Sequence, residues 1–318
     1  MEILAQPDHT RNGGLSGSIM AWSRNRGRPR LSLQQHMTIH EALAAAIPLL
    51  GPENARRDAE ALLAHLLHRD RASLLAHPET ELTSEQAAAF NALIARRAAR
   101  EPLQYITGHQ EFYGLDFRVT PGVLIPRPET EHLVEAVLLW ATQFHDEHLL
   151  QIADIGTGSG AIAIALATHL AGANFFATDI SEPALAIARD NAIIHHCEQR
   201  IHFAHGDLLS ALALPESFRF DAIVSNPPYV PTGDAATMQP EVVGHEPHVA
   251  LFAGDDGLEI YRRLIPAAHA ALHPCGLLAM EIGYGQRDAL TALLHDWKNV
   301  RFIDDYQRIP RTVLALRP

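Results

Sequence analysis

Cysteine and long apolar runs are both scarce in this chain. Its 318 residues include only Cys197 and Cys275, too few for a disulfide framework and too isolated for a zinc site. His195 and His196 stand beside Cys197 without a matching fourth ligand, so we expect no metal site. Uninterrupted apolar runs fall well short of the about 18 residues of a membrane span, and residues 1–30 lack the apolar core of a signal peptide. We therefore expect a cytoplasmic protein with two reduced, partly buried thiols and no membrane contact.

Positive charge is in deficit, with 37 acidic against 25 basic side chains and a formal net charge of −12. Residues 1–36 nevertheless hold five arginines and two acids and lack hydrophobic periodicity, which predicts a disordered basic tail. This tail is either a solvated extension, sequence upstream of a start at Met37, or a basic arm for RNA. Because the body is more acidic than the whole chain, we expect no direct binding to nucleic acid.

Three regions follow the tail. Residues 37–100 predict a helical domain, because capping boxes begin at Thr38 and Thr83 and leucines recur at helical spacing. Residues 101–128 change to short extended runs broken by glycine and proline, which predicts a β-hairpin linker. Residues 129–318 alternate strand and helix patterns and form the predicted catalytic domain.

The candidate strands of this last region are short apolar runs, and alanine-rich helical stretches separate most of them. They are 150–155, 175–179, 201–204, 220–225, 277–282, 300–304 and 312–316. Strands that alternate with helices predict an α/β fold with a mostly parallel sheet covered on both faces. Ligands of such sheets bind outside the carboxyl ends of the strands.

A glycine-rich turn ends the first of these strands. Gly156, Gly158 and Gly160 allow a tight turn against which a ligand can lie directly. With Ala161 they also fit the dinucleotide fingerprint, so a nicotinamide cofactor stays open beside S-adenosylmethionine. The candidate cofactor-binding residues of this turn are Asp154, Gly156, Thr157, Gly158, Ser159 and Gly160.

The next two strands each end in an acid. Asp179 can accept hydrogen bonds from both hydroxyls of a ribose. Asp207 can accept from the exocyclic amine of adenine while Leu208 covers a face of the ring, although an aspartate in this position can also cap a helix. Asp179, Asp207 and Leu208 are therefore further candidate cofactor-binding residues.

The fourth strand leads into Ser225-Asn-Pro-Pro-Tyr229. Pro227 and Pro228 have no N–H donors and hold the preceding residues extended. The side-chain oxygen of Asn226 and the carbonyls of Asn226 and Pro227 then form a rigid set of acceptors, which suits a planar NH₂ group on which Tyr229 can pack. Asn226, Pro227, Pro228 and Tyr229 are the candidate catalytic and substrate-binding residues, and Asn226 also borders the cofactor.

This tetrapeptide resembles the Asn-Pro-Pro-Tyr motif of amino-methyltransferases that use S-adenosylmethionine, whereas no dehydrogenase chemistry calls for it. The runs 124–131, 244–251 and 254–258 are similar to those of the HemK/PrmC glutamine methyltransferases of peptide chain release factors. This resemblance covers about residues 38–317 and departs at Leu208, where some members carry tryptophan. It implies a class I methyltransferase fold, Rossmann-like, with a seven-stranded sheet and S-adenosylmethionine as cofactor.

The resemblance also implies a reaction and a partner. A monomer would methylate N5 of the glutamine in the Gly-Gly-Gln motif of class 1 release factors and so support translation termination, with the helical domain recognising the substrate. From their place between prolines, we expect Arg127 and Glu129 to structure a substrate-side loop, and we expect Glu246, before Pro247, to cover the site passively. The alternatives are a ribosomal-protein glutamine methyltransferase, an adenine N6-methyltransferase and a non-catalytic adaptor. The acidic body disfavours nucleic acid, and the intact Asn226 disfavours the adaptor.

Overall fold

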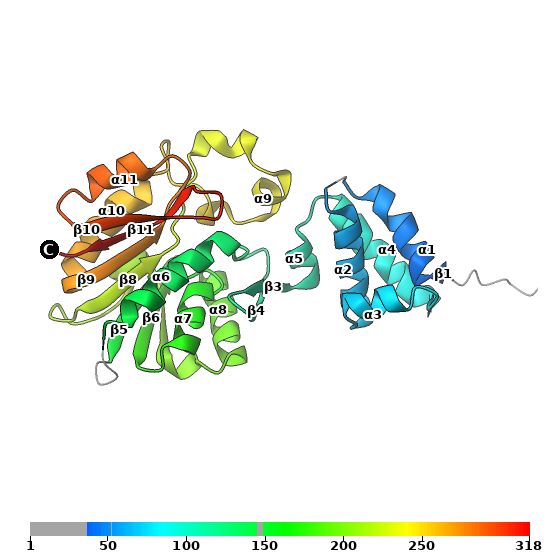
Figure 1. Ribbon diagram of the computed structural model, residues 1–318, viewed down its shortest axis with the longest axis horizontal. Coiled ribbons are helices and arrows are strands. Elements are labelled where there is room, and N and C mark those ends of the chain that lie inside the picture. The colour runs from blue at the N-terminus through cyan, green and yellow to red at the C-terminus, as the bar shows by residue number, and fades with distance from the viewer. Residues whose placement is uncertain (1–36, 52, 145–148) are drawn as a thin grey trace, which may run out of the picture. The chain divides into compact units, whose positions relative to one another are not determined.

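The computed structural model of the protein describes residues 37–51, 53–144 and 149–318 (Figure 1). The predicted basic tail over residues 1–36 lies outside these residues. Within the described ranges, no helix is both long and apolar enough to cross a membrane. Both cysteines are free, and Cys197 is buried whereas Cys275 is exposed. The expectation that both thiols are partly buried was therefore wrong for Cys275.

The first part of the described chain is a small bundle of helices. These are α1 (Ile39–Ala46), α2 (Ala55–Leu67), α3 (Arg71–Ala76), α4 (Ser84–Ala98) and α5 (Leu103–Thr107). Thr38 and Thr83 cap α1 and α4 through reciprocal capping-box hydrogen bonds, as the sequence predicts. Phe90 and Ile94 of α4 are buried in the core of this bundle, so one face of each helix is held by packing.

Two local features of this region differ from the sequence-based expectation. The short strands β1 (Met37–Thr38) and β2 (Glu81–Leu82) pair antiparallel within the helical region. The extended pattern expected from residue 101 begins late, because Leu103–Thr107 is helical and its Ile106 packs into the bundle core. Pro102 stands at the N-cap of this helix, and Gly108 ends it in the left-handed conformation with φ of 80°, both of which favour a short helix.

A hairpin follows this helix directly. Strand β3 (His109–Phe112) pairs antiparallel with β4 (Leu115–Arg118). Tyr113 and Gly114 form the two-residue turn, and both have positive φ, as the tight turns that match the twist of a hairpin require.

The rest of the chain builds a seven-stranded sheet, and the predicted α/β fold is confirmed. Its strands are β5 (Leu150–Ile155), β6 (Ala173–Asp179), β7 (Ile201–His205), β8 (Phe220–Ser225), β9 (Leu272–Glu281), β10 (Lys298–Asp304) and β11 (Pro310–Leu316). They lie in the order β10-β11-β9-β8-β5-β6-β7. Only β11 runs antiparallel to its neighbours, β9 and β10, in this sheet of described residues.

Helices cover both faces of the sheet (Figure 1). One face packs against α6 (Glu131–Ala141), α7 (Ala161–His169) and α8 (Glu182–Ile194), and the other against α10 (Glu259–Ala271) and α11 (Arg287–Leu293). In β5, Ile152 belongs to the first core and Ala153 to the second, because successive side chains of a strand point to opposite faces.

The strand order places the candidate site. From β5 the chain moves outward through β6 and β7, then returns to β8 on the opposite side of β5. Ligands of open α/β sheets bind at such a reversal of strand order. The hydroxyl of Ser225, at the end of β8, donates a hydrogen bond of 2.6 Å to the carbonyl of Ile155, at the end of β5. The glycine-rich turn and the Asn226–Tyr229 segment therefore begin side by side.

Candidate active site

Asp154 stabilises the glycine-rich turn through hydrogen bonds. Its side chain is fully buried, and its Oδ2 accepts hydrogen bonds from the Thr157 hydroxyl at 2.7 Å and the Ala163 N–H at 3.2 Å. Burial raises the pKa of the Asp154 carboxyl to about 7. Because these bonds link the end of β5 to the first turn of α7, Asp154 shapes the turn from behind its ligand-facing surface.

Gly158 and Gly160 serve the turn in different ways. Both have positive φ, 56° and 83°. Apart from its own residue and its two chain neighbours, a Cβ added to Gly158 would lie more than 4 Å from other described atoms, whereas one added to Gly160 would come within 2.8 Å of Ile164 Cδ1 and 3.2 Å of Ala188 Cβ. Gly158 thus leaves open space for a ligand, and Gly160 allows the turn to pack against α7 and α8.

Asp179, the last residue of β6, and Asp207, shortly after β7, border the same cavity. The Asp179 carboxylate accepts the N–H of Gly158 at its Oδ2 and the N–H of Ser181 at its Oδ1, each at 2.8 Å, and burial raises its pKa. Asp207 forms an ion pair with Arg263 of α10. Sequence reasoning did not identify Arg263, because a charged residue in an amphipathic helix carries no local signal of a site.

The Asn226–Tyr229 segment is held by a partly buried polar network. The Asn226 Nδ2 donates to the Thr130 hydroxyl oxygen at 3.1 Å, the Thr130 hydroxyl donates to Glu281 Oε2 at 2.5 Å, and the Tyr229 hydroxyl donates to Glu281 Oε1 at 3.1 Å. The Gln286 side chain donates to the Tyr229 carbonyl at 3.0 Å.

Sequence reasoning did not identify Thr130 and Glu281 as members of the site. Glu281 did give a signal that could have been used, since it is an acid inside the apolar run 277–282. An acid in such a run is rarely buried unless it has partners.

Two cavities meet at Asn226. The first is about 1170 Å³ including its open mouth. The predicted site residues that line it are Gly156, Thr157, Gly158, Ser159, Asp179, Asp207, Leu208, Asn226, Pro227 and Pro228. Asp154 and Gly160 are absent from its lining and lie behind the turn. The second cavity is lined by Asn226, Tyr229, Glu281 and Arg311, among others, so Asn226 borders both cavities.

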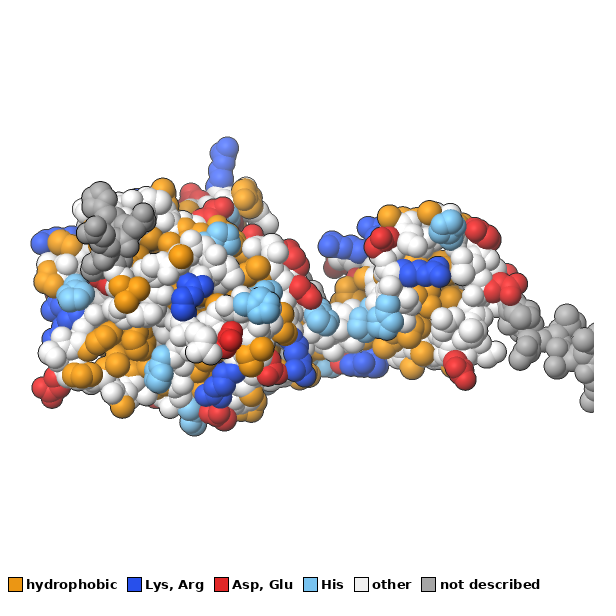
Figure 2. All heavy atoms as spheres, turned by 90° about the horizontal axis from the view of Figure 1, so that it is seen from below, with side chains coloured by type: hydrophobic (Ala, Val, Ile, Leu, Met, Phe, Trp, Pro, Cys, Tyr) orange, Lys and Arg blue, Asp and Glu red, His pale blue; other side chains and the backbone are white. Residues whose placement is uncertain are grey.

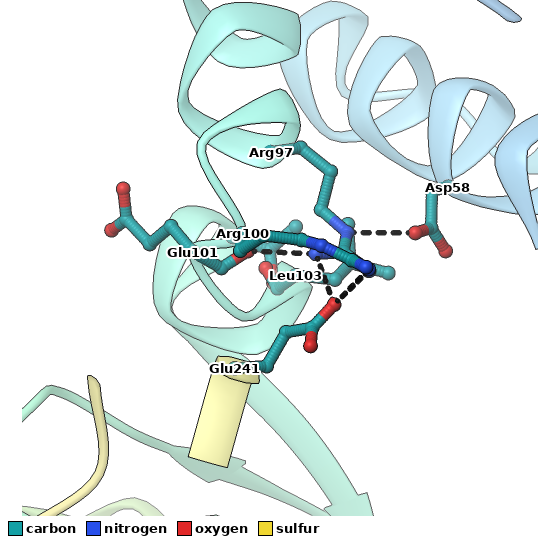
Figure 3. Close-up of polar contacts among 7 residues, drawn as sticks. Asp58, Arg97, Arg100, Glu101, Leu103 and Glu241 are labelled. Carbon is teal, nitrogen blue, oxygen red and sulfur yellow. Dashed lines mark hydrogen bonds and ion pairs between the residues drawn. The ribbon is translucent and has the colours of Figure 1, made fainter. Parts of the chain in front are cut away.

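Helix α9 (Pro240–His245) borders the second cavity through Val242 and is tied to the helical region by charge. Figure 3 shows the Glu241 side chain of α9 pointing toward Arg97 of α4 and Arg100 of the turn that follows α4. Its Oε1 accepts from Arg97 at 3.3 Å and from Arg100 at 2.9 Å. Arg97 also donates from Nε to Asp58 of α2 at 2.7 Å, and it therefore bridges two carboxylates.

The bridge predicts a difference in stability between two arginine variants. We expect Arg97→Met to lower the free energy of unfolding by about 2 kcal/mol, because it leaves the mostly buried Asp58 without its charged donor and leaves Glu241 with the exposed Arg100 alone. Arg100 is more than half exposed, and Arg100→Met should cost less than about 1 kcal/mol. Urea unfolding of the two variants measures both values, and equal losses would contradict a bridging role for Arg97.

Fold and site together define a methyltransferase: a mostly parallel seven-stranded sheet, a glycine-rich turn after its first strand in the chain and an Asn-Pro-Pro-Tyr segment after its fourth. Residues 131–243 match the methyltransferase small domain and residues 41–108 the PrmC N-terminal domain. The chain belongs to the family of release factor glutamine methyltransferases.

Relatives of that name support this membership over most of the chain. The release factor glutamine methyltransferase of Koribacter versatilis is 45% identical over 285 residues, which are 89% of this chain and 99% of that protein. That of Moorella thermoacetica is 45% identical over 287 residues, 88% of this chain and 99% of that protein. Among solved structures, the hMettl16 catalytic domain in complex with MAT2A 3′UTR hairpin 1 has a TM-score of 0.52 at 19% identity and covers 80% of this chain and 90% of that one. This likeness concerns the fold alone.

Proposed function

We propose that this protein transfers a methyl group from S-adenosylmethionine to the side-chain amide nitrogen (N5) of the glutamine in the Gly-Gly-Gln motif of class 1 peptide chain release factors. The observation that carries the proposal is the position of Asn226, which borders both cavities and can align a substrate amide in one with a methyl donor in the other. The names of the relatives support the choice of substrate.

The first cavity has the features that S-adenosylmethionine requires. The open space at Gly158 lets the ligand lie against the backbone. The fixed carboxylate of Asp179 can accept from ribose hydroxyls. Asp207 pairs with Arg263 through one carboxylate oxygen, and its other oxygen can accept from the adenine amine. Leu208, the next residue, lines the same cavity. When bound, S-adenosylmethionine supplies an electrophilic methyl group on a sulfonium.

Two glycine variants test this placement. We expect Gly158→Ala to weaken S-adenosylmethionine binding strongly while lowering the free energy of unfolding by only about 1–2 kcal/mol, the cost of a left-handed alanine. Gly160→Ala should destabilise the fold by about 2–4 kcal/mol, because its Cβ also overlaps Ile164. Calorimetric titration and thermal unfolding measure the two effects. If both variants lost binding and stability in equal proportion, the turn would have no separate ligand-facing surface.

On the substrate side, the amide needs alignment more than activation by a base. A carboxamide nitrogen is a poor nucleophile because its lone pair is delocalised. The Asn226 Oδ1 and the Pro227 carbonyl can accept its two N–H groups and so point the nitrogen at the methyl group. Orientation of this kind can contribute about 7–11 kcal/mol. No strong general base is required, since the methylated nitrogen is acidic and releases its extra proton readily.

We propose that the helical region, residues 37–100, recognises the release factor. We also propose that the protein acts as a monomer in the cytoplasm, where translation ends. On the face shown in Figure 2, acidic and basic side chains are interspersed. Binding to a nucleic-acid backbone relies instead on clustered basic residues. This surface supports a protein substrate over the adenine alternative.

The experiment that tests the function uses S-adenosylmethionine labelled in its methyl group. The protein is incubated separately with a release factor, with ribosomal proteins and with DNA, and mass spectrometry locates the label. We expect label on the glutamine of the Gly-Gly-Gln motif and none on a release factor in which alanine replaces that glutamine. Label confined to ribosomal protein or DNA would overturn the proposal, and label on none of them would favour the adaptor.

A further inference from the structure

Glu281 and Thr130 form a buried polar chain behind Asn226. Both side chains are almost fully buried, with 2% and 4% of their surface exposed. The chain runs from Glu281 Oε2 to the Thr130 hydroxyl at 2.5 Å, and from that hydroxyl oxygen to the Asn226 Nδ2 at 3.1 Å. These two residues are 151 positions apart in sequence, so only the fold brings them together.

The direction of each hydrogen bond in this chain follows from the chemistry of the groups. An ionised carboxylate can only accept, so the single proton of the Thr130 hydroxyl goes to Glu281. The Thr130 oxygen then offers only lone pairs to Asn226. The Asn226 carboxamide must therefore turn its NH₂ toward Thr130, which leaves its Oδ1 on the other side.

We propose that Glu281 is a positioning residue that acts through Thr130 to hold the Asn226 carboxamide with its oxygen toward the substrate amide. This inference rests on the proposed function, because the substrate amide must find an acceptor and not a donor. A reversed Asn226 carboxamide would present NH₂ to NH₂, and no hydrogen bond could form between them.

The surroundings of Glu281 support a fixed, ionised carboxylate. Its Oε1 accepts from the Tyr229 hydroxyl at 3.1 Å, so both of its oxygens have donors. The Tyr261 hydroxyl of α10 donates to its backbone carbonyl at 2.8 Å. Burial raises the pKa of the carboxyl to about 7. The hydrogen bonds from Thr130 and Tyr229 and the positive charge of Arg311 oppose this rise, whereas the negative charge of Glu129 adds to it. The carboxylate therefore prevails above neutral pH.

A pair of Thr130 variants tests the hydroxyl separately from the packing. Thr130→Val keeps the shape and removes the hydrogen bonds, and we expect turnover on a release factor to fall about 100-fold, the usual cost of a misplaced reacting group. The Kd for S-adenosylmethionine should change by less than about twofold. Thr130 lines the first cavity, but its hydroxyl is engaged by Glu281 and Asn226 and valine keeps its shape toward the cofactor. Thr130→Ser should recover most of the turnover. The matched control is Thr312→Val, because Thr312 is buried on β11 opposite Glu281 and its hydroxyl has no partner among the described residues.

A second measurement keeps this inference distinct from the proposed function. In the full ¹⁵N-labelled protein, the side-chain NH₂ signals of Asn226, identified by their loss in Asn226→Asp, should shift with pH around a midpoint near 7. The shift should be absent in Glu281→Gln. If wild-type protein fails to label any release factor, the proposed function falls, and the titration still decides the positioning role.

Four results would count against the inference. The first is unchanged turnover in Thr130→Val, and the second is a failure of Thr130→Ser to recover turnover. The third is an Asn226 signal that does not titrate in the wild-type protein. A loss of cofactor binding in Thr130→Val that matched its loss of turnover would also count against it, because it would indicate a structural role.

Discussion

Asn226→Ala is expected to lower the rate of methyl transfer by about 10²–10³-fold, the usual cost of removing one preorganised hydrogen-bonding group from an active site. The substitution deletes the Oδ1 that accepts the substrate amide and leaves the Thr130 hydroxyl without the donor it has at 3.1 Å. Cofactor binding should persist, because the rest of the first cavity is built from the glycine-rich turn, Asp179 and Asp207.

Single-turnover rates at saturating S-adenosylmethionine measure this loss, and calorimetric titration measures the Kd. The matched control is Asn91→Ala, an exposed asparagine on α4, which should leave both values as in the wild type. Turnover of Asn226→Ala within a few-fold of the wild-type value would refute alignment by the Asn226 side chain. An equal loss of binding and turnover would instead place Asn226 in the cofactor site alone.

The turnover should also rise with pH through about 7. Below that pH Glu281 gains a proton and can donate it to Thr130, whose hydroxyl is then free to donate to Asn226, so the carboxamide is no longer held in one orientation. Because the raised pKa belongs to an acid that must be ionised, turnover should fall below pH 7 and level off at that of Glu281→Gln, whose side chain imitates the protonated acid. Above the pKa it should be constant.

This pH profile can be assigned with one variant. Asp154 also has a pKa raised by burial to about 7, and Glu281→Gln retains it. We expect Glu281→Gln to have a lower turnover that does not depend on pH, so its pH profile should show no inflection near 7. An inflection near 7 that survived in Glu281→Gln would assign the profile to Asp154 and contradict the role of Glu281. Measurement at saturating cofactor limits the contribution of Asp154 in the wild-type protein.

The local elements of the protein were largely predictable from its sequence. The capping boxes at Thr38 and Thr83 form as predicted, because each depends on residues three positions apart. Strands β5 and β8 also have their predicted bounds. Helix α5 was missed because it is only five residues long, too short for an apolar periodicity to be visible.

The site also has parts that the sequence determined and parts that depend on the tertiary structure. By itself the sequence determined the glycine-rich turn and the Asn226–Tyr229 segment, because the missing Cβ of glycine and the fixed φ of proline limit the backbone locally. The tertiary structure alone decided that Glu281 stands behind Thr130, that Arg263 pairs with Asp207 and that Glu241 holds Arg97. Such contacts join residues far apart in the chain and depend on the order of the strands, which an alternating pattern of strands and helices leaves open.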